Sequence, residues 1–219
     1  MSKKVFFLIS SLLFFSHFSF AQNQVSTNEF RLNQLKTLMD YRFVGGYYGF
    51  ESMFLKSVKY TDEARQNCIV GIVIASFDVN CKGVITNIKL RNPLGYKMDD
   101  QISAFLKSTK GHWNPCQDQK YTHFEVPFMF NLKNTRTNTA DAAFVYVGDN
   151  PGYACLSDAY YMKKIKAALK KKKGNKAKDF LEILIHRDPY NTEYYQLLDQ
   201  SIKLTGKDKD KKNDNKKEK

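Results

Sequence analysis

Four cysteines are the side chains best suited to chemistry in this sequence. They are Cys68, Cys81, Cys116 and Cys155. A metal site usually needs closely spaced cysteines with histidines nearby, and the sequence has no Cys-x-x-Cys spacing. A nucleophilic cysteine needs a neighbouring base, for which the sequence offers loose candidates such as His112 and His123. The cysteines therefore predict structural bridges, and neither a metal site nor a nucleophile.

Three histidines follow the N-terminal segment, and none is placed for acid–base catalysis. His112 falls in an expected loop, His123 on the outward face of an expected strand, and His186 near the end of an expected helix. None of them has a carboxylate or a second metal ligand at a suitable spacing. The sequence therefore predicts a protein that is not an enzyme and that uses no cofactor and no metal.

The N-terminus has the pattern of a secretory signal peptide. Two lysines precede an uncharged stretch at 5–21, and small residues, Ser19 and Ala21, stand just before Gln22. This pattern favours cleavage between Ala21 and Gln22. An uncleaved membrane anchor is the alternative, because 17 residues is close to the shortest span of a bilayer. Export to the periplasm or cell envelope would allow two disulfides to persist.

The net charge of +13 is unevenly distributed along the chain. Residues 163–178 hold nine lysines and no acidic residue, and residues 203–219 hold eight lysines and four acidic residues. Lys3 and Lys4 add two charges, so the rest of the chain carries a net charge of −2. No recognition helix or aromatic RNA-binding signature accompanies the basic segments, and we predict no nucleic-acid partner.

Hydrophobic periodicity predicts helices at the N-terminus and then a hairpin. Ser26 and Glu29 have the spacing of a capping box, which favours a helix over 26–41, and a second short helix runs toward Tyr60. From Ile69 the period changes to two, which indicates a strand to Val79. The turn at Gly83 and an extended run over 84–90 complete the hairpin.

A helix and a third strand follow the hairpin. Apolar residues at helical spacing predict a helix over 97–108, and residues 122–132 alternate between apolar and polar side chains. Pro127 lies in this third strand and cannot donate a hydrogen bond to a ladder. Its nitrogen should therefore face outward, and the strand should lie at the edge of the sheet.

The rest of the chain is expected to form a connection, helices and a tail. Residues 133–156 look like a connection, although 143–147 could add a short strand. Three apolar stripes with breaks at Gly174 and Asp188-Pro189 predict helices over 157–205. Beyond Gly206 the chain has no apolar residue, so the tail should be disordered.

The segment 45–132 carries short motifs in a defined order. They are Gly45-Gly46, the helix to Tyr60 and Ala64, Gly71 to Val79 followed by Lys82-Gly83, Leu94-Gly95-x-x-Met98-Asp99, Gly111-His112-Trp113-Asn114-Pro115, and Val126 to Leu132. In order and spacing they resemble the C-terminal domain of the TonB family. The resemblance implies an α+β fold in which a β-β-α-β unit forms a three-stranded antiparallel sheet with helix on one face.

The resemblance also implies a binding role. Such domains bind short peptide segments of outer-membrane transporters, mainly at the edge of the last strand. Here that would be strand addition. The implied partner-binding residues are Thr122, His123, Phe124, Glu125, Val126, Pro127, Phe128, Met129 and Phe130.

The topology implied by the resemblance also pairs the cysteines. If the third strand lies beside the first, then Cys81 in the hairpin meets Cys116, and Cys68 is left with Cys155 at the other end of the sheet. A bond between Cys68 and Cys81 would have to cross a strand roughly 40 Å long, which no disulfide does.

The C-terminal helices carry a fainter resemblance to a tetratricopeptide repeat. The pattern from Gly174 to Phe180, then Asp188-Pro189-Tyr190-Asn191 and Tyr194-x-x-Leu197, makes one and a half repeats. Stable arrays generally need three repeats, which favours a helical appendage packed on the sheet unit.

These features give the expected organisation and three possible roles. The expected segments are a signal peptide (1–21), an N-terminal helix (22–44), a TonB-like domain (45–132), a connecting loop (133–156), a helical appendage (157–205) and a disordered basic tail (206–219). We expect an exported module that binds outer-membrane transporter segments or other envelope proteins in TonB-dependent transport. An anchored energy transducer is less favoured, because no proline-rich arm precedes Pro93 and cleavage after Ala21 would exclude it. The third role is an envelope scaffold whose lysines contact a membrane surface. The oligomeric state is not predicted.

Overall fold

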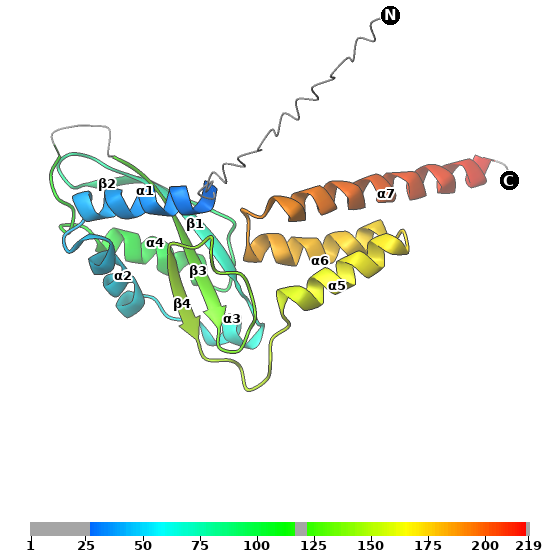
Figure 1. Ribbon diagram of the computed structural model, residues 1–219, viewed down its shortest axis with the longest axis horizontal. Coiled ribbons are helices and arrows are strands. Elements are labelled where there is room, and N and C mark those ends of the chain that lie inside the picture. Colours follow the sequence, from blue (N-terminus) through cyan, green and yellow to red (C-terminus); the bar gives the residue numbers. More distant parts are fainter. Residues whose placement is uncertain (1–26, 117–121, 218–219) are drawn as a thin grey trace, which may run out of the picture.

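The computed structural model describes residues 27–116 and 122–217, and for 27 and 206–217 it describes the backbone alone (Figure 1). The signal segment, the expected cleavage site at Ala21 and Gln22, and the capping residue Ser26 lie outside the described residues. None of the helices within the described ranges is long and apolar enough to cross a lipid bilayer.

Four strands form one mixed sheet. They are β1 (Gly71–Val79), β2 (Ile85–Arg91), β3 (His123–Leu132) and β4 (Phe144–Gly148), in the spatial order β2-β1-β3-β4. The first three strands are antiparallel neighbours, as predicted, but β4 pairs with β3 in parallel. The prediction of a three-stranded antiparallel sheet is therefore wrong in strand number. A parallel strand needs a long connection back to the start of its neighbour, and residues 133–143 supply it.

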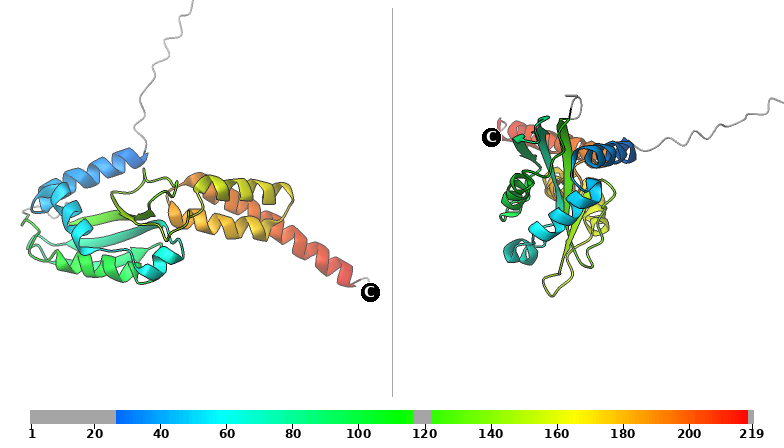
Figure 2. Two further views of the ribbon diagram at one scale, coloured as in Figure 1. Left: turned by 90° about the horizontal axis from the view of Figure 1, so that it is seen from below. Right: turned by 90° about the vertical axis from the view of Figure 1, so that its left-hand side faces the viewer.

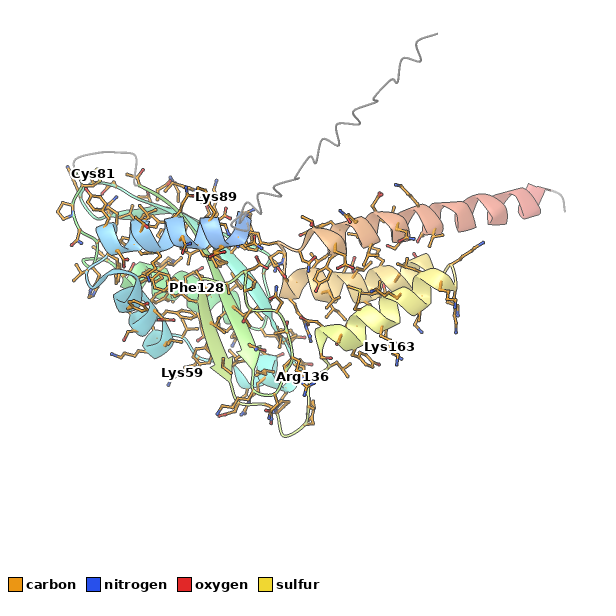
Figure 3. The ribbon with its side chains drawn as sticks, viewed as in Figure 1. Lys59, Cys81, Lys89, Phe128, Arg136 and Lys163 are labelled. Atoms are coloured by element: carbon orange, nitrogen blue, oxygen red, sulfur yellow. A yellow bond between two sulfur atoms is a disulfide. The ribbon has the colours of Figure 1, made fainter. Side chains whose placement is uncertain are left out.

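Helices α1 (Thr27–Arg42), α2 (Gly46–Ser57) and α4 (Met98–Ser108) bury their apolar sides against one face of the sheet, and the short α3 (Asp62–Gln66) leads into β1. Gly45 and Gly46 both have positive φ, which explains the break between α1 and α2. The core is strongly aromatic. Its fully buried rings include Phe50, Phe54, Phe105, Phe128 and Phe144, and Figure 3 labels Phe128 on the central part of the sheet.

The other face of the sheet is covered at one end by the C-terminal part of the chain. Helices α5 (Asp158–Lys170), α6 (Gly174–Arg187) and α7 (Thr192–Lys217) stack on one another and extend from the sheet unit (Figure 2). The apolar side chains beneath are Val70, Ile72, Ile74, Met129, Leu132, Ala142 and Cys155. The predicted helical appendage therefore packs on the sheet.

One close backbone approach holds α6 to the sheet. A Cβ added to Gly71 would lie 2.4 Å from the carbonyl oxygen of His186, so only glycine allows this distance. The side-chain amide of Asn92 donates to the same oxygen at 2.8 Å and to the carbonyl of Ile72 at 2.6 Å. The amide thus links α6 to β1.

The backbone of α7 is helical to Lys217, whereas the sequence predicts disorder from Gly206. The prediction rested on the absence of apolar residues after Gly206.

Candidate functional site

The predicted binding strand is not the edge of the sheet. Phe128, Met129 and Phe130 pair with Phe144, Val145 and Tyr146 of β4. The prediction that β3 is an edge strand is therefore wrong for its second half, because residues after the matched motifs return and add a strand.

Pro127 occupies the point where β4 begins. Its carbonyl accepts a hydrogen bond from the backbone amide of Ala143 at 2.9 Å, on the side away from β1. Because the amide and carbonyl of one strand residue point to the same side, the nitrogen of Pro127 also faces away from β1, as predicted. The outward side is occupied by the start of β4, and Pro127 itself is buried.

Contacts from two other elements hold the first half of β3. Tyr190, in the turn between α6 and α7, donates to Glu125 at 3.2 Å. The guanidinium of Arg31 in α1 lies 3.4 Å from the centre of the Tyr190 ring and donates to the carbonyl of Asp141 at 3.0 Å. Glu125 also forms an ion pair with Arg91 of β2. Glu125 therefore takes part in a junction, and the partner-binding role that the resemblance implies for it stays a prediction.

His123 lies on the exposed part of the sheet as predicted, in a hydrogen-bonded group. Its Nδ1 is 2.8 Å from Asp78, and Asn87 donates to the other carboxylate oxygen of Asp78 at 2.8 Å. The hydrogen bonds from Asn87 and His123 lower the pKa of Asp78. Among the described residues no group of three His, Cys, Asp or Glu side chains could hold a metal ion.

The outer side of β4 is the accessible edge at this end of the sheet. Lys133 donates its backbone amide to the carbonyl of Gly148 at 2.8 Å, so the main-chain groups of Gly148 face β3. Since the direction alternates along a strand, the amides and carbonyls of Val145 and Val147 face away from β3. Val147 is 50% exposed, and no strand in the described parts of the chain pairs with this side.

The opposite edge, on β2, has features that discourage pairing. The register between β1 and β2 shifts between Ser76 and Asp78, and Asn87 has a φ of 55°. The exposed Lys89 also lies on this strand (Figure 3). A bulge and a charged side chain are the usual protection of an edge strand. The regular outer side of β4 is therefore the better place for an added strand.

Aromatic packing anchors β4 itself. The ring of Phe144 is fully buried and stacks on Tyr47 at 4.7 Å and on Phe128 at 5.7 Å between ring centres. The hydroxyl of Tyr47 donates to the carbonyl of Ala143. Burial, followed by the charge of Glu51, raises the pKa of Tyr47 to about 12, so the phenol remains a donor at neutral pH. The strand is thus part of the core.

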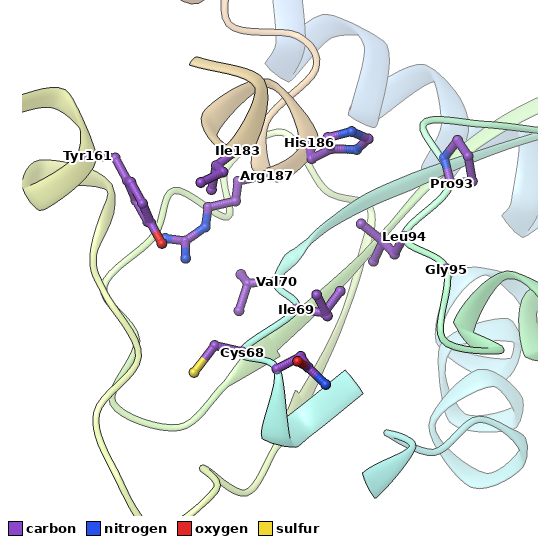
Figure 4. A pocket seen from close by; sticks show the side chains of 11 residues that line it. Cys68, Ile69, Val70, Pro93, Leu94, Gly95, Tyr161, Ile183, His186 and Arg187 are labelled. Atoms are coloured by element: carbon purple, nitrogen blue, oxygen red, sulfur yellow. The ribbon is translucent and has the colours of Figure 1, made fainter. Parts of the chain in front are cut away.

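A cavity of about 560 Å³ lies where α5 and α6 meet the sheet unit (Figure 4). Ile69, Leu94 and Ile183 contribute to its largely apolar wall. Arg187 also lines it, but its Nη1 donates to Asp158 at 2.8 Å and to the carbonyl of Leu156 at 2.9 Å. Arg187 therefore stabilises the junction between the helices and the sheet.

Both predicted disulfides form. Cys68 and Cys155 are joined with their Cα atoms 5.7 Å apart, and Cys81 and Cys116 with 4.5 Å. The first bond ties the segment after β4 to the start of β1, and the second closes the hairpin onto the residues before β3.

Part of the chain matches a known protein family. Residues 56–132 match the family model described as Gram-negative bacterial TonB protein C-terminal. This segment is similar to the TonB C-terminal domain, as the order of its motifs predicts. The match begins within α2 and ends at the last residue of β3, inside the 45–132 boundaries predicted from the sequence. No curated protein and no solved structure matches the chain.

The matched family is a periplasmic domain of Gram-negative bacteria that takes part in transport energy transduction, and the family is non-enzymatic. Strand β4 and helices α5 to α7 lie beyond the matched residues. The strand that covers β3 therefore lies outside the matched segment, and the apolar run at 143–147 is its signal in the sequence.

Two buried carboxyl groups meet beside this added segment. The amide of Asn138 donates to Asp141 at 3.1 Å and to Asp188 at 2.9 Å, and both acids are nearly inaccessible to solvent. Burial, followed by the charge of Asp188, raises the pKa of Asp141. A raised pKa means that the folded state holds the proton more tightly than the unfolded state does.

We therefore expect the free energy of unfolding to fall as Asp141 loses its proton. The fall begins near pH 4, the ordinary pKa of an aspartate, and ends above the raised pKa of Asp141 in the folded protein. In Asp141→Asn this part of the pH dependence should disappear. Urea unfolding between acidic and neutral pH measures the effect, with Asp100→Asn as a matched control on an exposed residue. An unchanged pH dependence in Asp141→Asn would contradict the assignment.

Proposed function

We propose that this protein is an exported TonB-like binding module that recognises an extended segment of an envelope protein by adding it to the outer edge of β4. The proposal rests chiefly on the outward main-chain groups of Val145 and Val147 at the edge of a TonB-like sheet, because no strand in the described parts of the chain pairs with them. The partner class suggested by the family is a peptide segment of an outer-membrane transporter or of another envelope protein.

Energetics favour this edge over β3. A partner that pairs with β3 would have to displace β4 and remove Phe144 from the core, at a cost of about 3–5 kcal/mol. A partner that pairs with the outer side of β4 leaves the core intact. Main-chain hydrogen bonds would supply affinity there, and the exposed Val147 would contribute to side-chain selection.

Val147→Pro tests the edge directly. It removes an outward amide at a position where an edge strand tolerates proline, so we expect affinity for transporter-derived peptides to fall at least about tenfold, with folding retained. Fluorescence anisotropy with labelled N-terminal peptides of outer-membrane transporters measures the affinity. Val147→Ala keeps the amide and serves as the control. Wild-type affinity in a folded Val147→Pro protein would show that the edge of β4 is not the site.

A further inference from the structure

Nine exposed lysines follow one another along α5, the turn after it and the start of α6. They are Lys163, Lys164, Lys166, Lys170, Lys171, Lys172, Lys173, Lys176 and Lys178, which we call the lysine surface. Lys163 is labelled in Figure 3, on the outer side of α5. Figure 1 places the turn between α5 and α6 at the end of the molecule far from β4.

Acidic side chains on α5 and α6 neutralise little of this charge. Lys178 pairs with Glu182 at 3.5 Å, and within the described part of the chain no other lysine of the surface forms an ion pair. Asp158 is already bound to Arg187. The lysine surface therefore keeps a large positive excess.

The packing of the helices does not explain lysines at the turn. Lys172 has a φ of 54°, a left-handed conformation that favours glycine. Lys173 is the N-cap of α6 and makes no side-chain cap, and the first turn of α6 has no acidic residue but contains Lys176. Positive charge is unfavourable at a helix N-terminus. The sequence thus holds lysine where glycine, serine or aspartate would stabilise the fold better.

The chemistry of the lysine surface fits a diffuse array of negative charges. On α5 the lysines lie opposite the buried Ile165 and Ala168, so they cover the solvent side of the helix. Lysine carries a compact charge, without the fork geometry by which arginine grips one phosphate. Many mobile anionic groups on one surface can form ion pairs with such lysines, whatever the lateral position of the protein on that surface.

We propose that the lysine surface binds the anionic phosphate headgroups of a bilayer. A periplasmic location, which this inference takes from the proposed function, would place the chain between two phospholipid membranes. Each lysine close to an anionic surface strengthens binding roughly fivefold. With the turn between α5 and α6 against the membrane, the edge of β4, which lies on the sheet unit away from that turn, stays accessible to a protein partner (Figure 1).

The test is co-sedimentation of the full chain with vesicles of phosphatidylethanolamine and phosphatidylglycerol, compared with phosphatidylcholine vesicles. We expect binding to the anionic vesicles alone, weakened by high salt. Replacing Lys170, Lys171, Lys172, Lys173 and Lys176 by glutamine should weaken it at least about a hundredfold. The control replaces five exposed lysines on the sheet unit and so removes the same charge. These are Lys56, Lys59, Lys89, Lys107 and Lys110.

Three outcomes would overturn the proposal. One is failure to bind anionic vesicles at low salt. Another is an equal loss in the two glutamine variants, which would assign binding to net charge and not to the lysine surface. The third is lysine-dependent binding to soluble polyglutamate without vesicle binding, which would indicate an acidic protein as the partner.

Discussion

Replacing Phe144 by alanine is expected to lower the free energy of unfolding by about 3–5 kcal/mol, although this residue lies on the last strand of the sheet. The ring is fully buried and packs against Phe50 and Phe54 of α2 as well as Tyr47 and Phe128. Its removal leaves a cavity in an aromatic core whose other members come from α2, α4, β1 and β3, and such a core cannot fully collapse.

Urea unfolding of Phe144→Ala measures this loss, with Val147→Ala as the control on the exposed side of the same strand. We expect the control to change stability by less than about 0.5 kcal/mol. If Phe144→Ala changed the free energy of unfolding as little as the control does, β4 would be only loosely attached to the core. The edge of β3 would then be open to partners, as the sequence alone predicts.

The elements of the TonB-like domain could be predicted from the sequence because their signals are local. The alternation that begins at Ile69 predicts the last residue of β1 and places its start two residues early, and the apolar stripe of Met98, Ile102 and Phe105 predicts α4. Each pattern is complete within one element and agrees with the element next to it. The disulfides followed because the strand order brings only certain cysteines together.

The candidate site could not be predicted because it depends on contacts between distant residues. The five residues of β4 resemble any short apolar run, and nothing local indicates that they return to pair in parallel with β3. Arg42 is a second example. A basic residue at the end of a helix is usually exposed, but this side chain is fully buried and donates to the carbonyls of Asn80 and Asn114.

Replacing Cys68 and Cys155 together by serine is expected to destabilise the protein by about 4 kcal/mol. The bond closes a span of 87 residues, and the stabilisation by a disulfide grows with the length of the loop that it closes. The matched control replaces Cys81 and Cys116, which close a span of 35 residues, and should cost slightly less. Denaturant unfolding of the two variants measures both effects.

The two cysteine variants should differ more in which region of the protein is destabilised than in the total loss of stability. Cys155 lies between β4 and α5, so loss of its bond loosens the segment that carries the helices across the sheet. Hydrogen exchange should then increase in α5 and α6, where only contacts such as that of Asn92 with His186 remain. Loss of the Cys81 bond should increase exchange near the hairpin and the start of β3 and leave α5 and α6 protected. Equal exchange in the helices of the two variants would show that packing alone holds the helices on the sheet.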